Sequence, residues 1–131
     1  MKVEWSNPIH FGGLGGYKWP NYEGVYVIAE KINGKLIAKY VGQGVIKDNM
    51  DKHKDWKNEQ NDCLAKVMKN RDEDTKVFHA EVKDDQDRNN AELTIYTYYG
   101  GKDLLCNEND PPLGKYDYTI NFPFSKIDPN Y

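Results

Sequence analysis

Residues 24–44, GVYVIAEKINGKLIAKYVGQG, decide the fold because they contain two strand-forming segments separated by a tight turn. Residues 24–30 and 35–41 are rich in β-branched and aromatic side chains, which favour strands. The dipeptide Asn33-Gly34 between them fits a type I′ turn, whose twist matches that of paired strands. The stretch therefore predicts an antiparallel hairpin that is broken by the glycines of residues 42–44.

Helices and one further strand are expected after the hairpin. Apolar residues at helical spacing predict a helix over residues 45–59 and a second, weaker one within residues 60–74. Residues 75–83 alternate between polar and apolar types, which predicts a half-buried strand. Its inward side chains are expected to be Phe78, Ala80 and Val82.

The residues alone leave the segment 85–99 undecided. Its second half favours strand by propensity, whereas Asp84 and Asp85 as N-cap candidates and the glycines after it favour helix. The tail that follows is expected to form either a last short strand or an extended clasp across the sheet. Residues 1–23 are expected to form an irregular arm held by its tryptophans, with a flexible glycine-rich loop in it.

Length and composition indicate one ordinary globular domain. The chain has 131 residues, of which 38% are hydrophobic and 30% are charged. No apolar run approaches the 18 or so residues that span a bilayer, and the N-terminus does not resemble a signal peptide. We therefore expect a cytoplasmic protein without membrane contact, in which Cys63 and Cys106 are reduced.

Charge argues mildly against tight, non-specific binding to nucleic acid. The formal net charge is −3, whereas proteins that grip phosphates usually carry a basic excess. One short stretch does gather basic residues, namely Lys47, Lys52, His53, Lys54 and Lys57. Interrupted by aspartates, such a run is most often a solvated helix face.

Two tripeptides give the hairpin a more specific meaning. Gly24-Val25-Tyr26 and Tyr40-Val41-Gly42 lie on its two strands, and a helix with His53 follows. In this arrangement the chain resembles the GIY-YIG nuclease superfamily. Further along, Glu92 in Ala-Glu-Leu and Asn107 in Leu-Cys-Asn-Glu also look like the pattern of that family.

The resemblance implies a fold and a domain organisation. It implies an α+β (mixed α/β) class, with a small mixed sheet of about three strands, an N-terminal β-hairpin and flanking helices. It also implies that residues 85–99 are helix. Residues 1–23 would then form the arm, and residues 24–131 a single GIY-YIG-like domain with a C-terminal tail.

It also implies roles for named residues in phosphodiester hydrolysis. Glu92 would hold one divalent ion, Mg²⁺ or Mn²⁺, which stabilises charge on the phosphate. Tyr26 and Tyr40 would line the site, with Tyr26 helping to activate water, and His53 would hydrogen-bond the attacking group or the phosphate. Asn107 would orient the glutamate and close its loop. Each residue type also has an ordinary structural role, from hairpin packing to a turn asparagine.

One residue departs from the pattern. The family has an arginine one helical turn before the histidine, and this chain has Asn49 there, which cannot contact a phosphate through a charged fork. Lys52 and Lys57 are the nearby cations that could compensate.

Two functions follow as hypotheses. The first is a metal-dependent DNA endonuclease or nickase with weakened activity, acting on DNA rather than RNA. The second is a catalytically inactive module that binds a nucleotide, a nucleic acid or a protein partner, such as a virus-encoded inhibitor or decoy. A small α+β domain that matches the motif by coincidence is the least favoured alternative.

Overall fold

The predicted hairpin forms the centre of a computed structural model, which describes residues 1–11, 17–111 and 113–126. Strands β2 (Glu23–Ile32) and β3 (Lys35–Val45) pair in antiparallel register. Asn33 and Gly34 between them have φ angles of 53° and 79°, as a type I′ turn requires. The predicted break at residues 42–44 is wrong, because β3 continues through these glycines and runs directly into a helix.

Two more strands complete the sheet in the described part of the chain. β4 (Thr75–Glu81) pairs with β2, and the short β1 (Ile9–His10) pairs with β4. The order is β1-β4-β2-β3, and every pair is antiparallel. The α+β class is thus confirmed, whereas the expected mixed sheet of three strands is corrected. The fourth strand comes from the arm of residues 1–23, which was expected to be irregular throughout.

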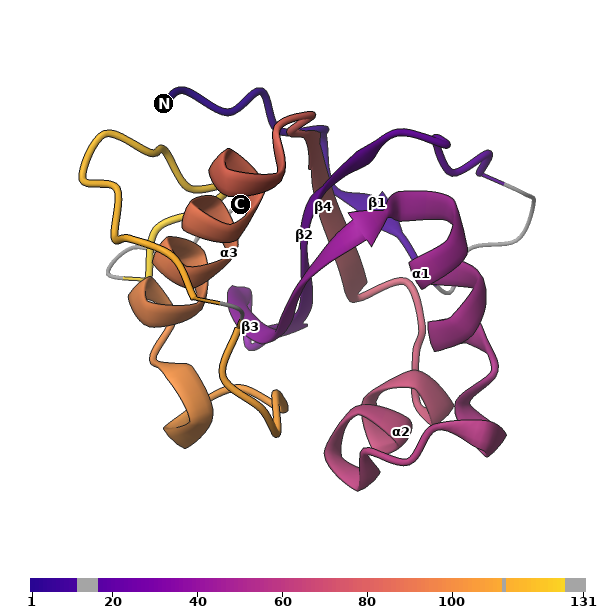
Figure 1. The fold of residues 1–131 in the computed structure, drawn as a ribbon. Coiled ribbons are helices and arrows are strands. Elements are labelled where there is room, and N and C mark those ends of the chain that lie inside the picture. The colour runs from indigo at the N-terminus through magenta and orange to yellow at the C-terminus, as the bar shows by residue number, and fades with distance from the viewer. Residues whose placement is uncertain (12–16, 112, 127–131) are drawn as a thin grey trace.

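Helices cover both faces of this sheet (Figure 1). α3 (Asp85–Tyr98) packs on one face, and α1 (Ile46–Lys54) and α2 (Asp62–Lys69) pack on the other. Each face therefore has its own apolar cluster. β4 is consequently buried on both sides rather than half-buried, with Phe78 in one cluster and Val77 in the other.

Local capping explains where α3 begins. α3 begins after Asp84, whose side chain accepts a hydrogen bond from the Asp87 N–H, and a glycine with φ 103° follows its end. The segment 85–99, which its residues alone left undecided between strand and helix, is therefore helical. The helix expected over residues 45–59 stops earlier, at Lys54, and a 3₁₀ turn, η1 (Trp56–Asn58), follows it. A second 3₁₀ turn, η2 (Gly101–Asp103), follows α3.

The C-terminal tail clasps α3 and the N-terminal arm, whereas the predicted clasp was expected to cross the sheet. In the described residues it contains no strand, and it runs along the outside of α3 (Figure 1). The Asn121 side chain hydrogen-bonds both backbone groups of Val3, which ties the tail to the N-terminal arm. Tyr99 donates a hydrogen bond to the Phe124 carbonyl at 2.6 Å and so ties the tail to α3.

The arm is held as expected by an aromatic side chain, since Trp19 is buried beside Phe11. The glycine-rich loop, residues 12–16, lies outside the described residues. Within the described chain, no helix combines the length and apolar character needed to cross a membrane.

A disulfide joins Cys63 at the start of α2 to Cys106 beyond η2. The expectation of two reduced cysteines is therefore wrong. Local sequence could not reveal this pairing, because the two residues are 43 positions apart. Disulfides are typical of oxidising compartments, so this bond does not favour the cytoplasmic location, which stays a prediction.

We expect the disulfide to stabilise the fold by about 2–4 kcal/mol, because it closes a long loop in the unfolded chain. Dithiothreitol should therefore lower the urea midpoint of the wild type. Cys63 is the exposed partner, so Cys63→Ser removes the bond with little change in packing. Cys63→Ser should match the reduced wild type and show no further response to the reductant. An unchanged wild-type midpoint on reduction would contradict the expectation.

Candidate functional site

Two glycines allow the central strands to approach each other and the Tyr26 phenol closely. Tyr26 lies opposite Gly42 in the β2–β3 ladder. A Cβ atom at Gly42 would lie 2.3 Å from the Tyr26 hydroxyl oxygen, so only glycine lets the phenol cross strand β3. Gly24 is constrained in the same way, because a Cβ there would lie 2.0 Å from the Ala80 carbonyl oxygen. Steric crowding thus explains why both motif positions are occupied by glycine.

The Tyr26 phenol ends against the helix that follows the hairpin. Its hydroxyl lies 2.8 Å from Nε2 of His53 and donates toward Oδ1 of Asn49 at 3.3 Å. The exposed fractions are only 1% for Tyr26 and 6% for His53. Tyr40 completes the group, with its ring centroid 5.2 Å from that of His53 and 6.1 Å from that of Tyr26. The two predicted tyrosines and the predicted histidine are therefore in mutual contact.

Glu92 approaches the same strand from the opposite face of the sheet. It lies on α3, and its Oε1 accepts a hydrogen bond of 3.0 Å from Nε2 of Gln43 on β3. Arg88 donates to the other end of the Gln43 side chain at 3.2 Å. Because a guanidinium can only donate, Gln43 must turn its oxygen to Arg88 and its amide protons to Glu92. This chain of contacts fixes the direction of the carboxylate.

Electrostatics keeps the aromatic group in its neutral forms. Burial, and then the charges of Glu92 and Glu59, raise the pKa of Tyr40. Burial likewise raises the pKa of Tyr26, with additions from Tyr40 and the same carboxylates. Burial lowers the pKa of His53. At neutral pH the two phenols are therefore protonated and the imidazole is uncharged.

Asn107 acts on the edge of the sheet. Its side-chain amide accepts from the Val41 N–H at 3.1 Å and donates to the Val41 carbonyl at 2.7 Å, as a neighbouring strand would. The Cys106 N–H donates to the Lys39 carbonyl at 2.6 Å, beside the bulge of β3. Asn107 therefore closes its loop onto β3, while the contact that orients Glu92 comes from Gln43.

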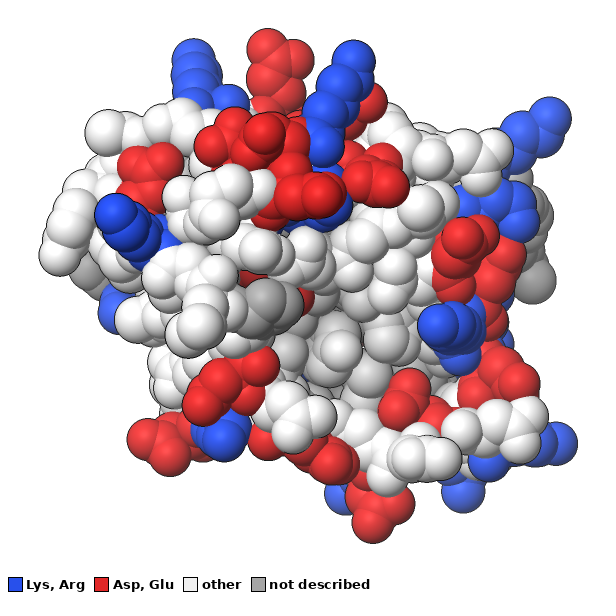
Figure 2. All heavy atoms as spheres, viewed as in Figure 1, with Lys and Arg blue, Asp and Glu red and all other residues white. Residues whose placement is uncertain are grey.

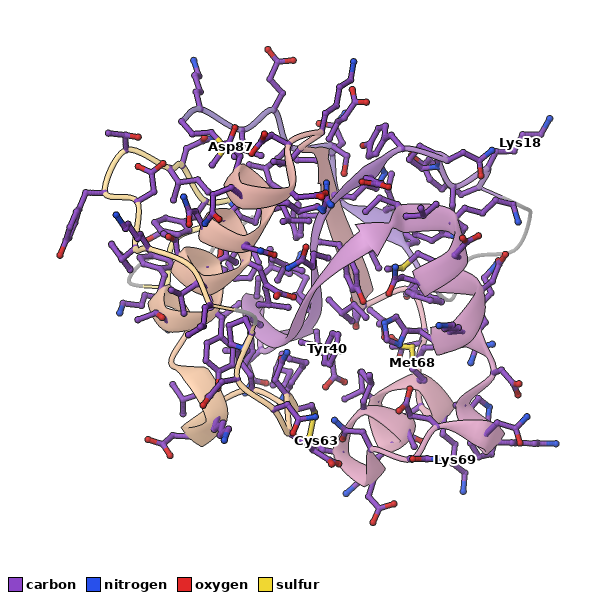
Figure 3. The ribbon with its side chains drawn as sticks, in the orientation of Figure 1. Lys18, Tyr40, Cys63, Met68, Lys69 and Asp87 are labelled. Atoms are coloured by element: carbon purple, nitrogen blue, oxygen red, sulfur yellow. A yellow bond between two sulfur atoms is a disulfide. The ribbon has the colours of Figure 1, made fainter. Side chains whose placement is uncertain are left out.

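A cavity of about 270 Å³ lies between this loop and the start of α2. Tyr40 lines it, and Figure 3 places Tyr40 between β3 and α2. The other lining side chains are mainly polar, namely Glu59, Gln60, Asn61, Leu64, Asn107, Glu108 and Asn109. Tyr40 is thus the member of the aromatic group that faces an open space.

The two candidate cations differ in their surroundings. The Lys57 ammonium lies 5.8 Å from the centre of the Trp56 ring. Lys52 is exposed and lines a surface hollow with Glu59, and its charge contributes to the lowered pKa of His53. Lys52 is therefore the better placed of the two candidates.

Charge on the face around β3 is mixed. Figure 2 shows mainly uncharged atoms between α3 on one side and α1 and α2 on the other, with Lys and Arg scattered among Asp and Glu around the rim. In the described part of the chain, no three His, Cys, Asp or Glu residues are grouped so that they could hold a metal ion.

Sequence reasoning missed Gln43 and Glu59. Gln43 stands between two glycines at the end of a predicted strand, where a polar side chain is free to face a helix across the sheet edge. Glu59 follows the predicted helix, and no local pattern marks it. Both are recognised only when the strand pairing and the turn after α1 are known.

Comparisons with known proteins add no relative, since no family model, no curated protein and no solved structure matches the chain. The interpretation of the candidate site therefore rests on the positions and contacts of its residues.

We expect acid to destabilise the protein through two buried histidines. Burial lowers the pKa of His53 and of His79 below the ordinary 6.5. As the pH falls from 7 toward 5.5, the unfolded chain takes up these protons while the folded chain resists them. The stability present at neutral pH is therefore lost on acidification, with a slope of at most about 1.4 kcal/mol per pH unit for each histidine.

Urea unfolding at several pH values would measure this effect. His53→Gln and His79→Gln should each flatten the decline, whereas His10→Gln, at an exposed position, should not. The raised pKa of Glu92 acts in the opposite direction, so the decisive quantity is the difference between variants. Equal slopes in all three variants would refute the assignment.

Proposed function

We propose that this chain has a GIY-YIG-type fold and acts as a metal-dependent endonuclease or nickase, on DNA rather than RNA, with weakened activity. The observation that supports the proposal is that predicted site residues lie in contact with one another. Residues selected from sequence motifs alone come from three elements, yet the Tyr26 hydroxyl contacts His53 at 2.8 Å and the Tyr40 ring packs on both. The charge of Glu92 also acts on both phenols.

The chain's own residues would share the work of phosphodiester hydrolysis. Tyr40 faces the cavity and is the phenol that an attacking water can reach. Tyr26 is buried behind it and connects it to His53, which is neutral and can accept a proton. Asn107 holds the loop that walls the cavity. The proposed reaction therefore begins at Tyr40 and uses Tyr26 indirectly.

Glu92 fits the single-carboxylate role that the proposed metal requires. Glu92 is 7% exposed, and Gln43 holds one of its carboxylate oxygens. A bound Mg²⁺ or Mn²⁺ would supply stabilisation of the charge that develops on the phosphate. It would also offset the negative charge of Glu92 and Glu59, which otherwise disfavours an anionic substrate near the tyrosines.

Plasmid nicking tests this proposal. Supercoiled DNA with Mg²⁺ or Mn²⁺ should be nicked slowly, and Glu92→Gln should reduce the rate by about 100-fold or more. Tyr26→Phe should reduce it by about 10²–10⁴-fold, as expected for a lost proton-transfer group. Glu108→Gln removes a carboxylate from the cavity that Tyr40 lines and should nick normally. The proposal fails if high protein concentration nicks no DNA in either metal.

The second candidate function is an inactive binding module for a nucleic acid, a nucleotide or a protein, and Asn49 favours it. The Asn49 amide donates to the Val45 carbonyl at 2.9 Å and presents its oxygen to Tyr26. The family's arginine would bring a cation to this position, and asparagine brings none. Losing a cation that contacts the reacting phosphate costs about 3–4 kcal/mol of transition-state stabilisation.

Restoring the arginine distinguishes the two functions. Position 49 is only half-buried, so a longer side chain has a route to the surface. Asn49→Arg should raise the nicking rate by about 10²–10³-fold if the site is a weakened nuclease. Asn49→Lys supplies charge without the planar fork and should raise it less. A folded Asn49→Arg protein that gains no activity would favour the binding module.

A further inference from the structure

The two nitrogens of His53 have different surroundings. Nε2 lies 2.8 Å from the Tyr26 hydroxyl, whereas Nδ1 is a buried atom without a hydrogen-bond partner. A carboxylate oxygen, Oε2 of Glu59, lies 3.8 Å from Nδ1. This separation is within the range of an ion pair and beyond that of a hydrogen bond. A carboxylate therefore faces the unpaired edge of the imidazole.

The Glu59 carboxylate is held where it lies. Its other oxygen accepts a hydrogen bond of 3.1 Å from the backbone N–H of Asn61. Asn61 is fixed in turn, because its side chain caps α2 at Leu64 and donates to the Cys106 carbonyl at 2.6 Å. The carboxylate is thus attached to the same turn that carries the disulfide.

Two proton arrangements of neutral His53 are compatible with the Tyr26 contact. With the proton on Nε2, the imidazole donates to the Tyr26 oxygen, and Tyr26 must donate to Asn49 at 3.3 Å. A bare Nδ1 lone pair would then face the Glu59 carboxylate, which is unfavourable. With the proton on Nδ1, an N–H faces Glu59 and Tyr26 donates to Nε2 across the shorter 2.8 Å contact.

We propose that Glu59 is a positioning residue that keeps the His53 proton on Nδ1, so that Nε2 serves as the base for the tyrosine pair. The order is carboxylate, imidazole and hydroxyl, in which the carboxylate sets the tautomer and stabilises the imidazolium that forms. The 3.8 Å contact shortens to a hydrogen bond when the imidazole becomes charged. This role rests on the proposed nuclease function, and it gives the site an activating group where the arginine is missing.

In the proposed reaction, a proton moves from water through the two tyrosines to His53. As a water oxygen forms its bond to phosphorus, its O–H bond breaks and the proton passes to the Tyr40 oxygen. Tyr40 gives its own proton to the adjacent Tyr26, and Tyr26 gives its proton to His53 Nε2 across their 2.8 Å contact. The bond from phosphorus to the leaving oxygen breaks with its electron pair, and the leaving oxygen takes a proton from solvent. The imidazolium then faces Glu59.

The charged and titratable groups around His53 act in opposite directions. Tyr26 from β2 and Tyr40 from β3 face it as neutral phenols, and Glu59 favours its charged form. Lys52, on the same helix, disfavours that form. Glu59 is therefore the group whose removal should weaken the imidazolium.

Imidazole ¹⁵N NMR of the metal-free protein tests the proposal without DNA. At a pH where His53 is neutral, the spectrum should show its proton on Nδ1, with the resonance assigned by its loss in His53→Gln. Glu59→Leu removes the acceptor and should lose the Nδ1–H form, with the proton moving to Nε2. Glu59→Gln keeps the shape, removes only the charge and should lower the pKa of His53. Glu108→Gln, which changes a carboxylate of the same cavity, should leave both properties unchanged.

A wild-type proton on Nε2, or a tautomer unchanged in Glu59→Leu, would overturn the role of Glu59. The outcome is independent of cleavage, which separates it from the test of the nuclease. A confirmed tautomer in a protein that never nicks DNA supports the Glu59 contact and removes the nuclease proposal. Nicking by a protein whose His53 tautomer is unchanged in Glu59→Leu supports the nuclease proposal and removes the role of Glu59.

Discussion

The pairing of Tyr26 with Gly42 is the constraint on which the rest of the site depends. Because Gly42 has no side chain, the phenol can lie across β3 and reach the helix that follows the hairpin. A ladder shifted by one residue would turn Tyr26 to the opposite face of the sheet, away from His53. The hairpin register therefore determines both the strand pairing and the contact on which the proposed chemistry is built.

The edge of β3 is where the two faces of the sheet meet. The aromatic group lies on the face covered by α1 and α2, while Glu92 belongs to α3 on the other face. Because β3 is the last strand, Gln43 can meet Glu92 on α3 while Tyr40 of the same strand faces the cavity. An exposed sheet edge also invites pairing with other chains. Asn107 covers it by satisfying the backbone of Val41.

Much of the fold could be predicted because its determinants are local. The turn at residues 33–34, the cap at Asp84 and the alternation in residues 75–83 each lie within a few positions of one another. The errors share the opposite property. Gly42 has low strand propensity, but pairing with β2 keeps it in the strand. The disulfide and β1 depend on partners far away in the chain, which no local pattern contains.

The same distinction applies to the candidate site. Family resemblance pointed to Tyr26, Tyr40 and His53, and these side chains are in contact. It could not point to Gln43 or Glu59, because their roles come from which nitrogen or oxygen each side chain faces. Such roles depend on which atoms face one another, and they are identified only when the three-dimensional positions of the side chains are known.

The absence of the arginine changes how the proposed chemistry can be driven. A tyrosine becomes a base either when a cation lowers its pKa or when a neighbouring base takes its proton. At this site burial and carboxylates raise the pKa of both tyrosines, which excludes the first route without an added cation. The second route remains, because His53 is neutral and is the immediate neighbour of Tyr26. Asparagine at position 49 is compatible with it, since its oxygen presents no charge to the phenol and leaves the imidazole as the better acceptor.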